Sequence, residues 1–266
     1  LHFELIPDHL PEVLKQAIMR FPAGALHFEV GIQTWNPEVQ ALISRRQDNE
    51  RAADNLAWLR SHTDALVHVD LIAGLPGEDV ASFGAGFDRL LALRPHEIQV
   101  GILKRLRGTP IARHTEAHAM RYNPDPPYNV LATGCIAFAD MQRIARFARY
   151  WDMVGNSGRF ARALALMFGD AGSPFARFMA FADWFYARTG KTHEIALERM
   201  YEALHAYLVE QMQIDGAAVE AALAADYEGS GAKGRLAFMS SGARPAPAHG
   251  NTERRRMRQV RHLQTG

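Results

Sequence analysis

The sequence predicts an α/β protein, in which a partial TIM-like (β/α) barrel of parallel strands precedes an all-helical C-terminal domain. Two patterns indicate this architecture. Short apolar segments of strand type alternate with helical segments up to residue 118. Apolar residues then recur at helical spacing over most of the remaining chain. We therefore expect a barrel part over residues 1–118, a helical domain over 119–228 and a tail over 229–266.

The barrel part is expected to contain four strands. Its helical segments begin at residues suited to a helix start, such as Asp8, Pro37 and Asp79. This alternation predicts parallel strands joined by right-handed crossovers, with too few strands to close a barrel. The expected strands cover 1–7, 26–33, 66–72 and 98–103, and the expected helices cover 8–20, 37–45, 48–62 and 79–93.

The helical domain follows a segment that cannot form a regular helix, because Arg121–Tyr128 contains three prolines. Ser173 is a suitable N-cap before Pro174, and Gly190 is a natural stop, so a helix is predicted over 174–189. Further helices are predicted over 128–154 and 193–213. Cys135 has apolar neighbours and is predicted to be a small buried hydrophobe.

Composition is that of an ordinary globular protein, with 266 residues, 48% hydrophobic residues and a formal net charge of +1. No apolar run approaches the ~20 residues that a membrane span requires. One cysteine excludes an internal disulfide framework. These observations predict a cytoplasmic protein without a membrane partner, and the near-neutral charge does not indicate a nucleic-acid partner.

The tail is rich in Gly, Ser, Ala, Pro and Arg, a composition that predicts disorder. Its segment Glu253–Arg261 is strongly basic. A solvated charge run is the preferred interpretation, and a contact with RNA or an acidic partner is the alternative.

Polar residues lie on one side of two successive expected strands. By alternation, Glu29, Gly31 and Gln33 face one side of the strand at 26–33, while its apolar residues face the helices. The next strand similarly directs His68 and Asp70 to one side. Because α/β barrels carry their chemistry at the carboxyl ends of the strands, we expect a functional site there.

An ordered series of residues runs through these segments. Arg45 follows Gln33 by twelve residues, and Asp70 follows Arg45 by twenty-five. Asp70 also begins the run Asp-Leu-Ile-Ala-Gly-Leu-Pro-Gly, which ends at Gly77. In this order the series resembles the middle of a radical S-adenosylmethionine (SAM) enzyme, in particular the oxygen-independent coproporphyrinogen dehydrogenases. The resemblance covers residues 1–118.

This resemblance implies a SAM site but no catalytic residue or metal ligand in this chain. Carboxylates suit the ammonium and ribose hydroxyls of SAM, and a guanidinium suits its carboxylate. A phosphate-binding loop is a weaker interpretation of Gly74–Gly77, because the Lys-Ser/Thr of a P-loop is missing and a tight turn explains the glycines. The implied SAM contacts are the residues Glu4, Gln33, Arg45, Asp70, Gly74 and Leu103, the last through its backbone.

The resemblance also implies a 4Fe-4S cluster, held in that family by a Cys-x3-Cys-x2-Cys loop. In the family the cluster cleaves SAM to a 5'-deoxyadenosyl radical, which abstracts hydrogen from the substrate. The sequence has one cysteine, outside the barrel part. We therefore expect the C-terminal portion of a longer enzyme, inactive alone, whose cluster-binding segment precedes residue 1. The substrate, a small molecule or a peptide, is not indicated.

The helical part resembles the C-terminal domain of unknown function of cobalamin-binding radical SAM proteins. The segment Asp125-Pro-Pro-Tyr128 is its most distinctive piece. The resemblance suggests a cobalamin-binding domain upstream, although this sequence contains no cobalamin motif.

Two other classes of function stay open. A cluster-free α/β barrel lyase or aldolase could use Asp70, Glu29 and Lys104 as acid–base groups. A non-catalytic module could bind a partner through the helical region or the arginine-rich tail. Whatever the function, the open edge of the four-strand sheet predicts that the isolated chain self-associates.

Overall fold

The computed structural model describes residues 1–169, 171–232, 234 and 236–239. The predicted basic run at 253–261 therefore lies outside the described residues. The chain forms two compact units, one from Leu1–Gly158 with Met167–Glu194 and the other from Arg159–Leu166 with the residues from Ile195 on.

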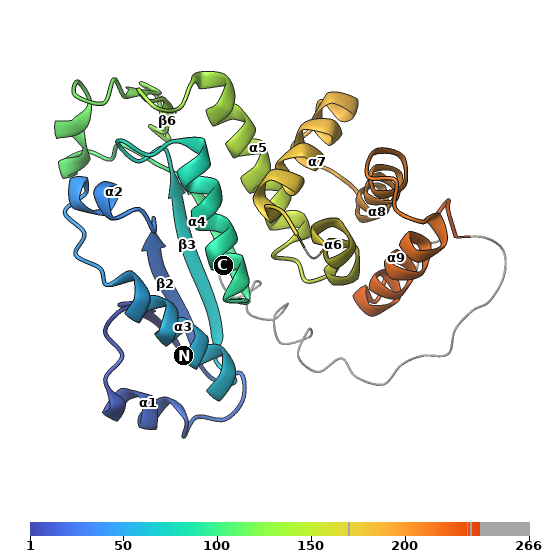
Figure 1. Cartoon of the computed structure of the whole chain (residues 1–266), viewed down its shortest axis with the longest axis horizontal. Coiled ribbons are helices and arrows are strands. Elements are labelled where there is room, and N and C mark those ends of the chain that lie inside the picture. The colour runs from blue at the N-terminus through green and yellow to red at the C-terminus, as the bar shows by residue number, and fades with distance from the viewer. Residues whose placement is uncertain (170, 233, 235, 240–266) are drawn as a thin grey trace. The chain divides into compact units, whose positions relative to one another are not determined.

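A parallel sheet of four strands forms the centre of the first unit (Figure 1). Its strands lie in the order in which they occur along the chain, and all neighbours are parallel. This arrangement confirms the predicted partial α/β barrel. The strands are β1 (His2–Leu5), β2 (His27–Gln33), β3 (Leu66–Ala73) and β4 (Glu97–Ile102).

Four helices follow or connect these strands. Side chains cap three of them, since Asn36 and Asp48 accept from backbone N–H groups at the starts of α2 and α3, and Asp79 accepts from the N–H of Ser82 in α4 at 2.7 Å. The helices are α1 (Glu12–Ile18), α2 (Pro37–Leu42), α3 (Asn49–His62) and α4 (Val80–Ala92).

The two faces of the sheet differ in polarity, as the alternation predicts. Val30, Ile32 and Val69 are fully buried on one face. The register pairs the residues of the other face across the strands and makes that face polar. Its titratable residues are His2, Glu4, His27, Glu29, His68, Asp70 and Glu97.

A long connection follows β4. The prediction of one helix over 128–154 is wrong at the start of that helix. Residues Val130–Ala132 form β6, which pairs with β5 (Arg121–Tyr122), and α5 begins only at Phe138 and ends at Val154. A turn precedes α5 because the hydroxyl of Thr133 accepts from the N–H groups of residues 135 and 136.

This turn also makes the prediction for Cys135 wrong. Cys135 is exposed, whereas the next residue, Ile136, is 1% exposed and takes the place in the core. A tight turn directs successive side chains in different directions, so apolar neighbours in the sequence did not imply burial of the cysteine.

The helix predicted over 174–189 is confirmed as α7 (Pro174–Thr189), with Ser173 as its N-cap and Gly190 left-handed at its end. Aromatic side chains join α4, α5 and α7. The Phe87 ring lies 4.8 Å from Trp151, and Phe147 lies 5.3 Å from Phe178. Asn156 also exchanges two 3.0 Å hydrogen bonds with the backbone of Ile98 in β4.

The second unit is helical. Tyr201 lies between the rings of Phe160 and Tyr227, with centroids 4.4 and 5.0 Å away. Within the described ranges, no helix is both long and apolar enough to cross a membrane. The segment predicted as a helix over 193–213 contains α8 (Leu197–Ala206) and a π-helical turn (Tyr207–Gln211). Two further helices are α6 (Ala161–Phe168) and α9 (Gly216–Ser230).

Candidate functional site

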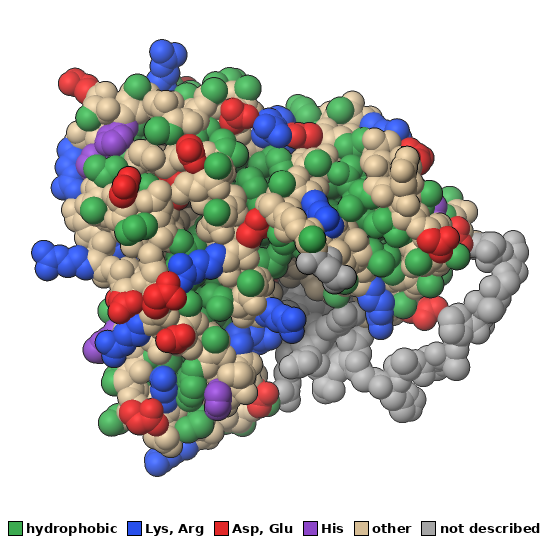
Figure 2. All heavy atoms as spheres, viewed as in Figure 1, with side chains coloured by type: hydrophobic (Ala, Val, Ile, Leu, Met, Phe, Trp, Pro, Cys, Tyr) green, Lys and Arg blue, Asp and Glu red, His purple; other side chains and the backbone are tan. Residues whose placement is uncertain are grey.

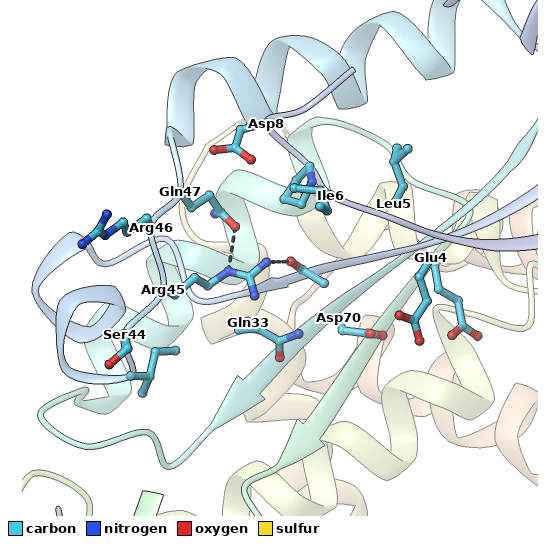
Figure 3. Close-up of a pocket in the computed structure, with 14 residues that line it drawn as sticks. Glu4, Leu5, Ile6, Asp8, Gln33, Ser44, Arg45, Arg46, Gln47 and Asp70 are labelled. Carbon is cyan, nitrogen blue, oxygen red and sulfur yellow. Dashed lines mark hydrogen bonds between the residues drawn. The ribbon is translucent and has the colours of Figure 1, made fainter. Parts of the chain in front are cut away.

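A pocket lies where the carboxyl ends of β1, β2 and β3 meet the loop before α3 (Figure 3). Its volume is about 830 Å³, within the usual range for a cofactor site. Four of the six predicted SAM contacts line it, namely Glu4, Gln33, Arg45 and Asp70. Residues that are 66 positions apart in the sequence thus share one cavity, together with Leu5, Ile6, Pro7, Asp8, Glu29, Gly31, Ile43, Ser44, Arg46 and Gln47.

The guanidinium of Arg45 is held in place by the protein. One of its terminal nitrogens donates to the carbonyl of Gly31, and its Nε donates to Oε1 of Gln47 at 2.9 Å. Burial lowers the pKa of Arg45, while the carboxylate of Asp8 opposes that shift. These contacts orient the guanidinium and leave donors for an anionic ligand group.

Gln33 ends β2 in a left-handed conformation, with φ of 67°. A non-glycine residue in this region is uncommon and occurs often at functional sites. The Oε1 atom of Gln33 is buried and has no hydrogen-bond partner among the described residues. Its amide nitrogen lies over Gly31, where an added Cβ would be 2.5 Å away. The amide therefore has an unused acceptor at the pocket.

Three carboxylates converge on the other side of the pocket. Glu4 and Glu29 are register partners on β1 and β2, and both act electrostatically on Asp70. Burial, with the charges of Glu29 and Glu4, raises the pKa of Asp70 to about 6. A cation bound here would relieve this repulsion. Glu29 was placed on the correct face by alternation, but its place in the pocket depends on the register with β1.

Histidines lie on the same polar face of the sheet as the pocket, nearer the amino ends of the strands. His2 contacts Glu29 at 3.1 Å, and His27 lies between the rings of His2 and His68, at 4.4 and 3.9 Å. Burial lowers the pKa of His27, and both of its ring nitrogens are buried without a partner among the described residues. Alternation along the strand predicts the side on which His68 lies, but the row of histidines depends on the register of three strands.

The two remaining predicted contacts, Gly74 and Leu103, do not line this pocket. Gly74 has φ of +87°, and a Cβ there would lie 2.4 Å from Cγ1 of Val130 in β6. The backbone of Leu103 donates to Ala73 at 3.0 Å and accepts from Val130 at 2.8 Å. Both positions thus serve the packing of β6 beside β4, and their contacts with SAM stay predictions.

The glycine turn shows the geometry of a tight strand-to-helix connection, since Gly77 also has a positive φ, of +81°. Its buried neighbour Glu78 accepts from the hydroxyl of Thr34 after β2. Burial raises the pKa of Glu78 to about 7. The turn is therefore tied to the end of β2.

Across the described residues, no group of three or more His, Cys, Asp or Glu side chains could hold a metal ion. The ring centroids of His114 and His118 lie 5.6 Å apart, but no third ligand joins them.

Comparison with known proteins identifies the helical half. Residues 116–250, half of the chain, match the family described as "Protein of unknown function (DUF4080)". The chain belongs to the DUF4080 family. The predicted resemblance of the helical part to a domain of unknown function agrees with this match, whereas the link to cobalamin stays a prediction.

The other half of this DUF4080 protein is similar to radical SAM enzymes. An oxygen-independent coproporphyrinogen III oxidase of Paracoccus denitrificans is 28% identical over 95 residues, covering 36% of this chain and 21% of that protein. The one of Thermostichus vulcanus is 36% identical over 77 residues, covering 29% and 24%. The anaerobilin synthase of Escherichia coli O157:H7 is 29% identical over 94 residues, covering 35% and 21%.

Two solved structures are also similar to part of this chain. The coproporphyrinogen III oxidase HemN from Escherichia coli, a radical SAM enzyme, is 28% identical, with a TM-score of 0.38, and the match covers 42% of this chain and 26% of that one. The archaeal Elp3 of Methanocaldococcus infernus has the same TM-score at 21% identity. The relatives confirm the predicted radical SAM relationship. The DUF4080 protein nevertheless spans less than a quarter of the length of the curated relatives it matches.

Proposed function

We propose that this pocket binds SAM and that the chain is the C-terminal portion of a radical SAM enzyme acting on a substrate of unknown structure. The observation that supports the proposal is the convergence of Glu4, Gln33, Arg45 and Asp70 in one cavity. The order of these residues along the sequence is the basis of the resemblance to the family. Their grouping in one cavity is a separate observation, because it depends on the fold.

The chemistry of the lining fits SAM at both ends of its amino-acid part. An ammonium suits the carboxylates of Glu4, Glu29 and Asp70, which otherwise repel one another. The carboxylate of SAM suits the guanidinium of Arg45, which is already oriented by Gly31 and Gln47. The unused Oε1 of Gln33 can accept from a ribose hydroxyl or the ammonium.

In this proposal the residues of the chain bind and orient the ligand and hold protons. Asp70 becomes fully ionised when a cation binds beside it, because an opposite charge lowers the pKa of a carboxyl group. Arg45 keeps its charge and fixes the carboxylate end. The polar face below the pocket offers imidazole and carboxylate groups to a substrate.

A 4Fe-4S cluster, when bound beside SAM, would supply the electron for its cleavage and hence for hydrogen abstraction. The residues of this chain do not fit such a cluster, since the sequence has one cysteine and the described residues contain no metal-binding group. The proposal therefore assigns the cluster ligands to residues outside 1–266, and cobalamin, if used, to a further domain.

Calorimetric titration of the chain with SAM tests the proposal. We expect saturable binding, which Arg45→Ala and Asp70→Asn each weaken about 10- to 100-fold, because each loses a charge-assisted hydrogen bond. Arg46→Ala is the matched control, since Arg46 lines the same cavity but has no place in the motif series. Absence of saturable binding, or equal losses in all three variants, would contradict the proposal.

The two alternatives are less well supported. A cluster-free lyase would use Lys104 with Asp70 and Glu29, but Lys104 is exposed and does not line the pocket. A purely partner-binding module would leave the grouping of Gln33, Arg45 and Asp70 in a cavity unexplained.

A further inference from the structure

The segment after β4 concentrates positive charge at the edge of the sheet where the pocket lies. Residues 104–121, here called the basic rim, contain one carboxylate, Glu116. All five cations of the rim are exposed, and Figure 2 shows Lys and Arg side chains at the outer edge of this part of the surface. The five cations are Lys104, Arg105, Arg107, Arg113 and Arg121.

Within the described part of the chain, none of these five cations pairs with a carboxylate. In α5, by contrast, Arg143 pairs with Asp140 and Asp183 at 3.0 and 2.8 Å, and Arg149 contacts Asp152 at 3.7 Å. The rim therefore carries a local excess of charge that the near-neutral net charge of the chain hides.

The basic rim is an ordered platform. Met120 donates from its backbone to Thr115 at 2.8 Å, and the strand pair β5–β6 closes the loop. The guanidinium of Arg105 lies 4.9 Å from the centroid of the Tyr122 ring. Binding would therefore cost little ordering of this segment.

The rim also adjoins the proposed SAM pocket. Arg113 donates to the hydroxyl of Ser44 at 2.7 Å and to the carbonyl of Leu42 at 3.0 Å, and Ser44 lines the pocket. A ligand lying along the rim would thus pass the mouth of the pocket.

We propose that the basic rim binds a single-stranded nucleic acid. Exposed cations bind one anion weakly, so affinity requires many contacts along an extended polyanion. Arginine forks match phosphate oxygens, and exposed rings such as Tyr128, 39% exposed, offer a face on which a base stacks. Binding of the nucleic acid does not depend on the proposed function. The idea that this nucleic acid is the substrate does rest on the proposed function.

Fluorescence anisotropy with the full chain and a labelled single-stranded RNA tests this proposal. The rim variant removes three cations whose side chains make no hydrogen bond or ion pair with the described residues. The control variant removes three exposed cations elsewhere, so both variants have the same net charge. The rim variant is Lys104→Gln, Arg107→Gln and Arg121→Gln, and the control is Arg20→Gln, Arg94→Gln and Lys191→Gln.

We expect the rim variant to lose about tenfold or more in affinity at low salt, and the control to bind as the unmodified chain does. The slope of log affinity against log salt should fall by about 2 in the rim variant, since each phosphate contact contributes ~0.7 for a single strand. Thermal melting by circular dichroism checks that both variants are folded.

Three outcomes would overturn the proposal. Unchanged affinity of the rim variant would assign binding to the basic run at 253–261. Equal losses in both variants would show a general charge effect. Displacement by inorganic phosphate at constant ionic strength would indicate a compact anion site. SAM titration of the same variants separates the two proposals, because the rim variant keeps the pocket residues and should bind SAM normally.

Discussion

Asp70 carries a charge that the pocket leaves uncompensated. Its pKa is about 6 in the folded protein, against an ordinary value of 3.8, because of burial and the nearby Glu29 and Glu4. Between these pH values the folded protein holds a proton that the unfolded chain has released. The free energy of unfolding therefore falls as the pH rises through this window.

Replacing Asp70 with Asn should remove this dependence. We expect Asp70→Asn to melt at a higher temperature than the unmodified chain at pH 8, and the difference to vanish toward pH 3.5. Melting temperatures across this pH range measure it. Asp54→Asn, on the exposed side of α3, is the control and should show no such trend. Equal pH profiles for Asp70→Asn and the unmodified chain would mean that the folded pocket does not raise the pKa of Asp70.

At the scale of elements, the turn after β3 depends on a close approach of β6. Gly74→Ala places a Cβ 2.4 Å from Val130 at a φ of +87°. We expect a loss of about 1–3 kcal/mol in the free energy of unfolding, measured with urea, from strain and overpacking.

Gly101→Ala in β4 is the matched control for this prediction. Its added Cβ would meet the carbonyl of Leu71 at 3.6 Å and Ile72 at 3.8 Å, both ordinary contacts, and its φ is not positive. The change should alter stability by less than about 0.5 kcal/mol. A loss as large as that of Gly74→Ala would mean that any side chain on these elements is destabilising, and that the approach of β6 has no special role.

At the scale of the whole molecule, β1 is an edge strand with apolar side chains beside it. Phe3 is 48% exposed, and Ile6 and Val13 are 65% and 83% exposed. An unpaired edge next to apolar surface favours association between copies. The self-association predicted from the sequence is therefore retained as a prediction.

Light scattering over a range of concentrations measures this association. We expect the mass of the unmodified chain to rise with concentration, and Phe3→Lys to reduce the rise, because a lysine blunts the edge. Phe138→Lys, which changes a residue 55% exposed at the start of α5, should have no effect. A monomeric mass at every concentration for the unmodified chain would show that the edge does not pair.

The elements that were predicted well have strong local signals. The alternation in β2 and β3 and the Ser173-Pro174 start and Gly190 end of α7 each depend on neighbours in the sequence. The start of α5 was missed because the hydroxyl of Thr133 builds a turn where periodicity alone favoured a helix. Cys135 was misplaced for the same reason.

The sequence was enough to predict that the four strands are parallel, that one face of the sheet is polar and that Glu4, Gln33, Arg45 and Asp70 are candidate site residues. Period and motif order are properties of the chain, so these required no coordinates. The three-dimensional arrangement was needed to show that these four share a cavity with Glu29 and that Gly74 and Leu103 lie outside it. It was also needed to show that the cations after β4 have no carboxylate partner among the described residues. Register and loop packing decide those facts, because they bring together residues that are far apart along the chain.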